Sequence, residues 1–268
     1  MGLKRLFCNN YFIMYLIKIS FFIAVFFLLY GIAPLIAQPS FMDSQKKNAR
    51  VYEVAKRGED SLKSNLKKQF GKCEFSQVYF RSFKFDMQFE IWVKPNPTDS
   101  FILYKTLPVC YGSGVLGPKR FEGDYQIPEG FYTISNFNPN SEFHLSLGLN
   151  YPNASDRMVC DSLRPGGDIY IHGGCVSVGC IPVEDEAIEE IYLLSSMAKS
   201  YGQEFIPVHV FPGRFNNFIS ETYINNYAAK DASYLKFVNN LKLGFNYFEA
   251  NRKLPLVLVN KKGEYIFK

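Results

Sequence analysis

Residues 166–182 read GGDIYIHGGCVSVGCIP, an apolar run closed by a histidine and followed by glycines and two cysteines. Residues 169–172 within it are apolar and β-prone and have glycines on both sides, so they predict a short buried strand that ends at His172. Cys180 lies eight residues further along the chain. That separation is roughly 26 Å in an extended strand, so the two side chains can meet only if the chain reverses between them.

The glycines between His172 and Cys180 permit this reversal. Gly173, Gly174 and Gly179 tolerate the positive φ that a reversal over so few residues requires. A free cysteine, with a pKa of about 8.5, is mostly protonated at neutral pH, and a neighbouring imidazole can remove its proton. Gly179 also leaves the local backbone N–H groups open to a substrate carbonyl. The pattern predicts a nucleophilic thiol with a histidine base.

Other interpretations of the same residues stay open. A cysteine in a strand-rich region is commonly a small buried apolar side chain, and a histidine is commonly structural. His172, Cys175 and Cys180 could bind zinc with a fourth ligand from His144, His209 or a distant cysteine, although the ligand spacing of known zinc modules is absent. A Cys175–Cys180 disulfide would block the nucleophile.

The N-terminal segment, residues 1–37, predicts export. Basic residues precede residues 19–36, ISFFIAVFFLLYGIAPLI, a run without a charge, and Ala37 follows as a small residue suited to cleavage. The run is nearly long enough to span a bilayer, so a retained anchor in the inner membrane is the alternative to a cleaved signal peptide. In both cases the basic flank puts the rest of the chain outside the cytoplasm, in the periplasm or cell envelope.

The exported part keeps an odd number of cysteines, namely Cys73, Cys110, Cys160, Cys175 and Cys180. At least one thiol therefore stays unpaired unless two chains are joined. The sequence leaves open whether the other four pair.

Local patterns divide the rest of the chain. Residues 38–74 predict a polar tether over 39–47 and a helix over 48–70 that Gly71 ends. Residues 75–212 predict a β-rich catalytic core, and residues 213–268 a helical extension with a terminal hairpin. Apolar periodicity predicts the elements themselves: strands over 77–93, 101–109, 131–135, 142–149 and 205–211, and helices over 184–202 and 233–252.

The charge pattern argues against nucleic acid as a partner. The 268 residues carry a formal net charge of +5, and no Lys/Arg block suited to a nucleic-acid arm occurs. We expect contact with a membrane only through the N-terminal segment.

HGGCVSVGC resembles the active-site segment of L,D-transpeptidase catalytic domains, in which a His-Gly precedes a Ser-x-Gly-Cys. Three further blocks, LGPKRFEGDYQIPEGFYTI, NPNSEFHLSLGLNYPNASDR and VHVFP, resemble one branch of that family. The resemblance covers residues 76–212. Members of this branch include a periplasmic enzyme that cuts the link between peptidoglycan and the major outer-membrane lipoprotein.

The resemblance implies a β-rich α+β fold, with a mixed β-sandwich or barrel and flanking helices. It implies that Cys180 is the nucleophile and His172 the proton donor and acceptor, with a main-chain carbonyl beside the histidine in place of an acidic residue. The implied substrate is a peptidoglycan stem peptide, attacked at a bond next to its meso-diaminopimelate D-centre, and a wall-linked lipoprotein is a further implied partner. No metal or organic cofactor is implied.

Other positions receive supporting roles from the same resemblance. Gly173, Ser177 and Gly179 match supporting positions of the motif, and the N–H groups around Val178, Gly179 and Cys180 are implied to form the oxyanion site. A further family block contains four candidate substrate-binding residues that could equally form a structural turn: Tyr151, Asn153, Asp156 and Arg157.

Two positions depart from the members that cross-link stems. Those members have His-Gly-Cys where this chain has Val178-Gly179-Cys180, and an arginine where this chain has Pro182. Both changes remove polar groups beside the nucleophile, so a murein hydrolase or amidase that releases wall-linked peptide or protein stays open beside the transferase. A non-catalytic peptidoglycan-binding module is the alternative of another class.

Overall fold

The computed structural model describes Ser20, residues 39–161 and residues 163–268. Apart from Ser20, the expected signal peptide or anchor at residues 1–37 lies outside the described residues. No helix in the described part of the chain is long and apolar enough to cross a membrane. Residues 40–268 form one compact unit.

A mixed sheet of eight strands lies at the centre of this unit, in the order β3-β2-β1-β8-β4-β5-β6-β7. Adjacent strands are antiparallel, except that β1 runs parallel to β8 and β6 parallel to β7. The strands are β1 (Gln77–Phe83), β2 (Gln88–Lys94), β3 (Ile102–Pro108), β4 (Gly130–Asn138), β5 (Ser146–Leu149), β6 (Tyr170–His172), β7 (Ile181–Pro182) and β8 (Pro207–Phe211).

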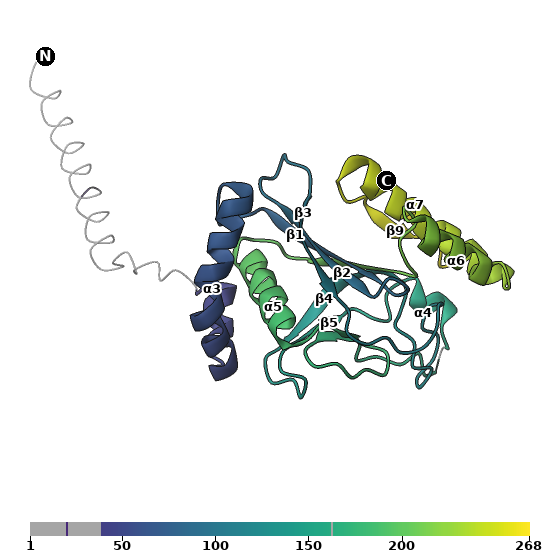
Figure 1. Ribbon diagram of the computed structural model, residues 1–268, viewed down its shortest axis with the longest axis horizontal. Helices are drawn as coiled ribbons and strands as arrows, with labels where there is room; N and C mark the ends of the chain where they lie inside the picture. The colour runs from purple at the N-terminus through teal and green to yellow at the C-terminus, as the bar shows by residue number, and fades with distance from the viewer. Residues whose placement is uncertain (1–19, 21–38, 162) are drawn as a thin grey trace, which may run out of the picture. The chain divides into compact units, whose positions relative to one another are not determined.

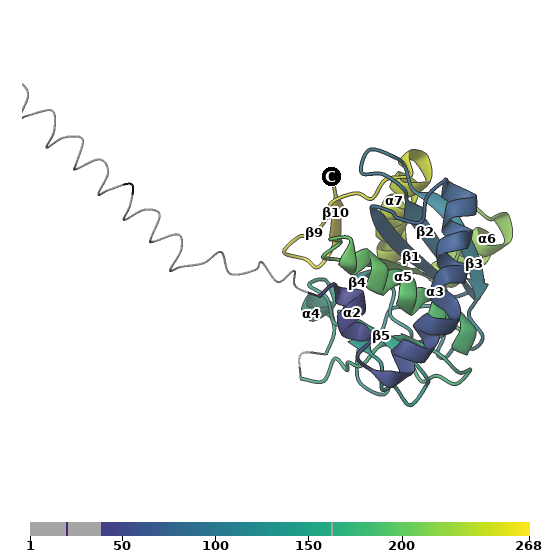
Figure 2. The same cartoon turned by 90° about the vertical axis from the view of Figure 1, so that its left-hand side faces the viewer.

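Helices cover both faces of the sheet (Figures 1 and 2). One face carries α3 (Ala49–Phe70) and α5 (Asp185–Ser200), and the other carries α6 (Phe218–Ala228) and α7 (Ala232–Asn251). The remaining elements are α2 (Phe41–Gln45), α4 (Asp156–Val159) and the hairpin of β9 (Val257–Val259) and β10 (Tyr265–Phe267). The predicted β-rich α+β fold with flanking helices is confirmed.

The helix predicted over residues 48–70 is confirmed, and its caps explain its ends. The Asn48 side chain accepts the N–H groups of Arg50 and Val51, and Gly71 ends the helix with a φ of 79°. The apolar side chains of α3 are buried in the main core, together with those of α5 and of the sheet. This packing fixes α3 to α5 and to the sheet.

The predicted tether over residues 39–47 is wrong, because this segment contains α2. Ser40 and Asp43 form a reciprocal capping box at its start. Met42 is buried, and its backbone N–H donates to Ser200 Oγ at the end of α5 (2.8 Å). A five-residue helix is too short to display the apolar periodicity on which the prediction relied.

The single strand predicted over residues 77–93 is a hairpin, with β1 and β2 joined by a turn at 84–87. Met87 takes a φ of 51° in this turn. The Asp86 carboxylate is held from across the chain by the Arg214 N–H (2.8 Å) and the Ser220 hydroxyl (2.5 Å). Alternation of apolar residues continues through the turn, so the sequence pattern hid the reversal.

Residues 213–268 pack on the same sheet through an apolar cluster and a buried charge network. Arg81 on β1 is 1% exposed and pairs with Glu90 on β2 and Glu249 on α7, each at 2.7 Å. A buried charge that loses a partner is strongly destabilising. The network therefore ties α7 to the centre of the sheet.

Candidate active site

His172 and Cys180 lie on or next to the two adjacent strands β6 and β7 at one edge of the sheet. His172 is the last residue of β6 and pairs with Pro182 of β7, while Cys180 directly precedes β7. The Tyr170 N–H on β6 donates to Cys180 Sγ at 3.4 Å. The chain thus loops back between the two residues, as the sequence predicts, and Cys180 comes to lie beside Tyr170, two residues from His172.

The glycines of the connecting loop have two different functions. Gly174 and Gly179 adopt positive φ values of 67° and 122°. Gly173 instead allows a close approach, because a Cβ atom there would lie 2.3 Å from Asp185 Oδ1 and 2.9 Å from the Phe143 carbonyl oxygen. A side chain at Gly173 would displace the loop that carries Cys180, and one at Gly174 or Gly179 would strain the backbone of that loop.

The imidazole and the thiol share a cavity of about 260 Å³. Its lining consists of Asn138, Ser141, Glu142, Phe143, Ser146, Asp168, Tyr170, His172 and Cys180. A larger groove of about 640 Å³ between α7 and the β9–β10 hairpin contains neither cysteine nor histidine. The smaller cavity is therefore the candidate active site.

The surroundings of His172 leave it a neutral base. Its Nδ1 lies 2.5 Å from the Gly173 carbonyl oxygen. A carbonyl only accepts hydrogen bonds, so Nδ1 carries the hydrogen and Nε2 keeps a free lone pair. Burial lowers the pKa of His172 below its usual value, and the Gly173 carbonyl opposes this shift. This is the main-chain carbonyl partner that the family resemblance implies.

The Cys180 thiol is protonated in the resting site. Burial raises the pKa of Cys180, and the nearby Asp168 carboxylate raises it further. The Tyr170 N–H and the more distant Lys119 act in the opposite direction. A neutral thiol and a neutral imidazole in the same cavity match a general-base mechanism rather than a preformed ion pair.

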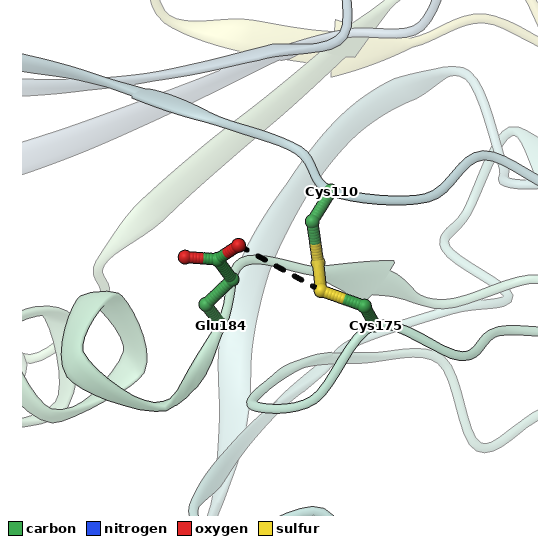
Figure 3. Close-up of side chains that lie close together, drawn as sticks. All are labelled: Cys110, Cys175 and Glu184. Carbon is green, nitrogen blue, oxygen red and sulfur yellow. Dashed lines mark hydrogen bonds between the residues drawn. A yellow bond between two sulfur atoms is a disulfide. The ribbon is translucent and has the colours of Figure 1, made fainter.

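Cys175 is bonded to Cys110, so it does not pair with Cys180 (Figure 3). The Cα atoms of the two bonded residues are 5.5 Å apart, and 65 residues separate them in the sequence. In the described part of the chain Cys73, Cys160 and Cys180 are free. The alternative of a Cys175–Cys180 disulfide is therefore wrong.

The disulfide also removes Cys175 from the zinc site considered above. The two histidines considered as a fourth ligand are engaged elsewhere: His144 Nε2 lies 2.6 Å from Glu189 Oε1, and His209 Nδ1 lies 2.6 Å from the Tyr79 hydroxyl. Glu184 does lie near the disulfide, 3.9 Å from Cys175 Sγ. The disulfide instead joins the loop between His172 and Cys180 to the segment that follows β3 (Figure 3).

Ser177 organises the end of the loop that carries the nucleophile. Its Oγ accepts hydrogen bonds from the N–H groups of Gly179 (3.2 Å) and Cys180 (2.8 Å) and donates to the Cys180 carbonyl (2.9 Å). Val178 between them is 73% exposed. The N–H groups of Gly179 and Cys180 were expected to form the oxyanion site, but both donate to Ser177 Oγ. That expectation is therefore corrected.

The family block at residues 151–157 lies outside the cavity and forms a structural network. Asn153 and Asp156 are buried. The Asn153 side-chain amide donates to the Tyr265 hydroxyl (2.9 Å) on β10, and the Tyr132 hydroxyl on β4 donates to Asp156 (3.0 Å). Neither of the other two candidates lines the cavity: the Tyr151 hydroxyl donates to the Pro165 carbonyl, and Arg157 is exposed. The block corresponds to the structural alternative, since it joins the terminal hairpin to the sheet.

Asp156 should make folding stability depend on pH. Burial raises its pKa from 3.8 to about 6, so the folded protein prefers the protonated acid. Its contribution to stability is present below pH 3.8 and is lost as the pH rises through about 6, a cost of about 3 kcal/mol. The difference in the free energy of unfolding between Asp156→Asn and wild type should therefore shift in favour of the variant as the pH rises. From about pH 4 to about pH 7.5 the shift should be about 2–3 kcal/mol. Urea unfolding at both pH values measures this, and a difference independent of pH would contradict it.

Several cavity residues were not foreseen from the sequence, chiefly Asp168, Tyr170 and Glu142. Tyr170 could have been found by strand periodicity, because it precedes His172 by two residues and shares its face. Asp168 precedes Tyr170 by the same interval and also lines the cavity. Glu142 comes from a distant loop, and no local pattern marks it.

Comparison with known proteins identifies a family. A model of the L,D-transpeptidase catalytic domain matches residues 89–210, which include both His172 and Cys180. The putative L,D-transpeptidase YafK of Escherichia coli K12 is 33% identical over 193 residues, which cover 71% of this chain and 74% of that protein. The protein of the same name from Escherichia coli O157:H7 matches to the same extent.

Solved structures resemble the chain more distantly. The helical cell shape determining protein Pgp2 of Campylobacter jejuni is 15% identical, with a TM-score of 0.40 and 82% of each chain covered. Bd1075 of Bdellovibrio bacteriovorus is 15% identical, with a TM-score of 0.38, covering 70% of this chain and 78% of that one. Similarities this weak carry no argument about function.

Proposed function

The chain belongs to the L,D-transpeptidase family, and from this premise we propose that it is a peptidoglycan-active cysteine acyltransferase. Cys180 is the nucleophile in this proposal, and His172 is the proton donor and acceptor. The observation that carries it is the shared cavity, which is lined by both a free thiol and an imidazole whose Nε2 is unprotonated. The substrate is the stem peptide of peptidoglycan, attacked next to its meso-diaminopimelate D-centre.

The mechanism follows from the resting protonation states. As Cys180 Sγ attacks the scissile carbonyl carbon, its proton passes to His172 Nε2, and the Gly173 carbonyl stabilises the imidazolium through Nδ1–H. The tetrahedral intermediate then collapses, the carbon–nitrogen bond breaks, and the imidazolium protonates the leaving amine. A thioester on Cys180 remains. Water or an amine attacks it, with His172 again accepting the proton, and the free thiol is restored.

The lowered pKa of His172 predicts how activity depends on pH. An ordinary histidine is half protonated at pH 6.5, but the buried His172 stays neutral to a lower pH. The rate of Cys180 acylation should therefore fall in acid with a midpoint below pH 6.5. Stopped-flow acylation by a carbapenem across this range measures the midpoint, and a midpoint above 6.5 would contradict the assignment.

The fate of the thioester distinguishes transferase from hydrolase. An incoming D-amino acid carries a carboxylate that an arginine would hold bidentately. This chain has Pro182 in place of that arginine, and neither Arg157 nor Arg164 lines the cavity. Loss of this contact weakens the binding of an acceptor amine, so water competes better for the thioester. The first acylation step is unaffected. These observations favour the second candidate function, a murein hydrolase or amidase that releases wall-linked peptide or a wall-linked lipoprotein.

This reasoning predicts the product pattern. When residues 38–268 are incubated with purified peptidoglycan, released stems or stem-linked peptides should outnumber new 3–3 cross-links. Mass spectrometry of the soluble products gives the ratio. Abundant new cross-linked dimers without any trimmed or released product would restore transpeptidation in the strict sense.

The alternative from another functional class is a module that binds peptidoglycan without catalysing a reaction. It predicts that a thiol-directed carbapenem leaves the protein unmodified, since acylation needs an activated thiolate. The acyltransferase proposal predicts a single carbapenem adduct on Cys180. An adduct elsewhere would undo the residue assignment.

The cellular location and domain division complete the proposal. We place the mature protein in the periplasm or cell envelope, exported through residues 1–37 as a signal peptide or as an inner-membrane anchor. The Cys110–Cys175 bond is consistent with an oxidising compartment. Residues 75–212 form the catalytic domain in this scheme, with 38–74 before it and 213–268 as a C-terminal extension.

A further inference from the structure

Asp168 lies at the rim of the catalytic cavity, two residues before β6. Its backbone carbonyl oxygen is 3.5 Å from Cys180 Sγ. Its side chain is exposed, and its φ of 54° is in the left-handed region that non-glycine residues seldom adopt. The fold thus holds a carboxylate-bearing residue against the nucleophile.

The charged side chains that line this cavity are all acidic. Two carboxylate residues, Asp168 and Glu142, line it, and no lysine or arginine does. Within the described residues, neither carboxylate forms a hydrogen bond or an ion pair. Both are therefore free to meet a charged group of a ligand.

Two basic side chains of this region, Lys119 and Arg50, are engaged with other groups. Lys119 Nζ pairs with Asp124 (2.6 Å) and donates to the Phe121 carbonyl (3.0 Å). Arg50 Nη1 donates to the carbonyls of Ser141 and His144, at the base of the loop that carries Glu142. Neither cation neutralises Asp168 directly.

An unpaired carboxylate beside a thiol opposes the chemistry proposed for the site. Its negative charge disfavours the thiolate, and Asp168 does raise the pKa of Cys180. A cation bound at Asp168 would cancel this repulsion at the moment when substrate is present. A carboxylate of the substrate in the same place would face two like charges.

We propose that Asp168, together with Glu142 of the same cavity, binds a positively charged amino group of the substrate beside the scissile carbonyl. The inference rests on the proposed function, because it names the substrate group that the same cavity takes. The amino group is a primary ammonium, carried either on the side chain of the diamino acid that is acylated or on the residue that leaves. Its binding would both select the substrate and favour ionisation of Cys180.

Binding to the Cys180→Ala protein tests the inference without turnover. The probes are two synthetic stem tetrapeptides that differ only in whether the side-chain amine of the diamino acid is free or acetylated. Calorimetry should give about fivefold tighter binding of the free amine, a preference that shrinks as salt rises. Adding Asp168→Asn should reduce the preference below about twofold, and Glu142→Gln should reduce it partly. Glu53→Gln, an exposed carboxylate on α3, is the matched control and should leave the preference unchanged.

A second pair of peptides identifies which residue carries the amine. Both members have the acetylated diamino acid, and the fourth residue is D-alanine in one and D-lysine in the other. Preference for D-lysine, lost with Asp168→Asn, would assign the ammonium to the leaving residue. Equal binding within both pairs, or preferences that Asp168→Asn leaves unchanged, would overturn the inference.

Failure of the inference can be told from failure of the proposed function. If wild-type protein cleaves the two members of each peptide pair at equal rates, in both pairs, the acyltransferase stands and the ammonium site falls. If no stem is cleaved and no carbapenem adduct forms, the acyltransferase falls, and the binding preference of the Cys180→Ala protein still decides the ammonium site.

Discussion

Cys180→Ala should abolish both carbapenem acylation and turnover of stem peptides, a loss of at least about 10⁴-fold. Every covalent step of the proposed mechanism passes through Cys180 Sγ, so no other group can replace it. The fold should persist, because alanine fits where the thiol was and the Ser177 hydrogen bonds use only the backbone of Cys180. Intact-protein mass spectrometry measures the adduct, and circular dichroism checks the fold.

A second free thiol provides the control for this result. Cys73 is unpaired and lies between α3 and β1, outside the cavity. Cys73→Ala should therefore be acylated at the wild-type rate. An adduct retained by Cys180→Ala, mapped to Cys73 or Cys160, would mean that the labelled cysteine was assigned wrongly.

His172→Ala should slow acylation by roughly two to four orders of magnitude near neutral pH, the usual contribution of a positioned base. Without the imidazole, the rate should follow the thiolate fraction of Cys180, whose pKa burial raises above the ordinary value. The rate of the variant should then rise about tenfold per pH unit in alkaline solution. Wild type should be nearly flat over the same range, because its base is already neutral.

His144→Ala is the matched comparison for this variant. His144 lies two residues from the cavity-lining Ser146, but its Nε2 is engaged with Glu189 and it does not line the cavity. Its removal should leave the acylation rate and its pH profile near wild type. If His172→Ala reacted as fast as wild type near neutral pH, the imidazole would not be the base.

The sequence predicted those parts of the fold whose signal is local. The helix over residues 48–70 has its own caps and a continuous apolar face, so both its existence and its ends could be read directly. The turn of the β1–β2 hairpin at 84–87 interrupts no alternation, and its Asp86 is held by residues more than a hundred positions away. Its position depends on tertiary contacts that no window of sequence contains.

The same division holds in the candidate site. His172 and Cys180 were found because they lie eight residues apart in one glycine-rich motif. The partner of Cys175 is 65 residues away, so the spacing of the cysteines could not identify it. The expected oxyanion donors failed for another reason: the sequence names Ser177 but cannot say that its hydroxyl occupies the N–H groups of Gly179 and Cys180.

The most direct test of the central claim is digestion of purified peptidoglycan by residues 38–268, with the Cys180→Ala protein in parallel. The products are resolved and identified by mass. We predict that wild type changes the stem peptides, releasing stems or stem-linked peptides, and that Cys180→Ala leaves the peptidoglycan unchanged. Identical product profiles for the two proteins would contradict the claim that this chain acts on peptidoglycan through Cys180.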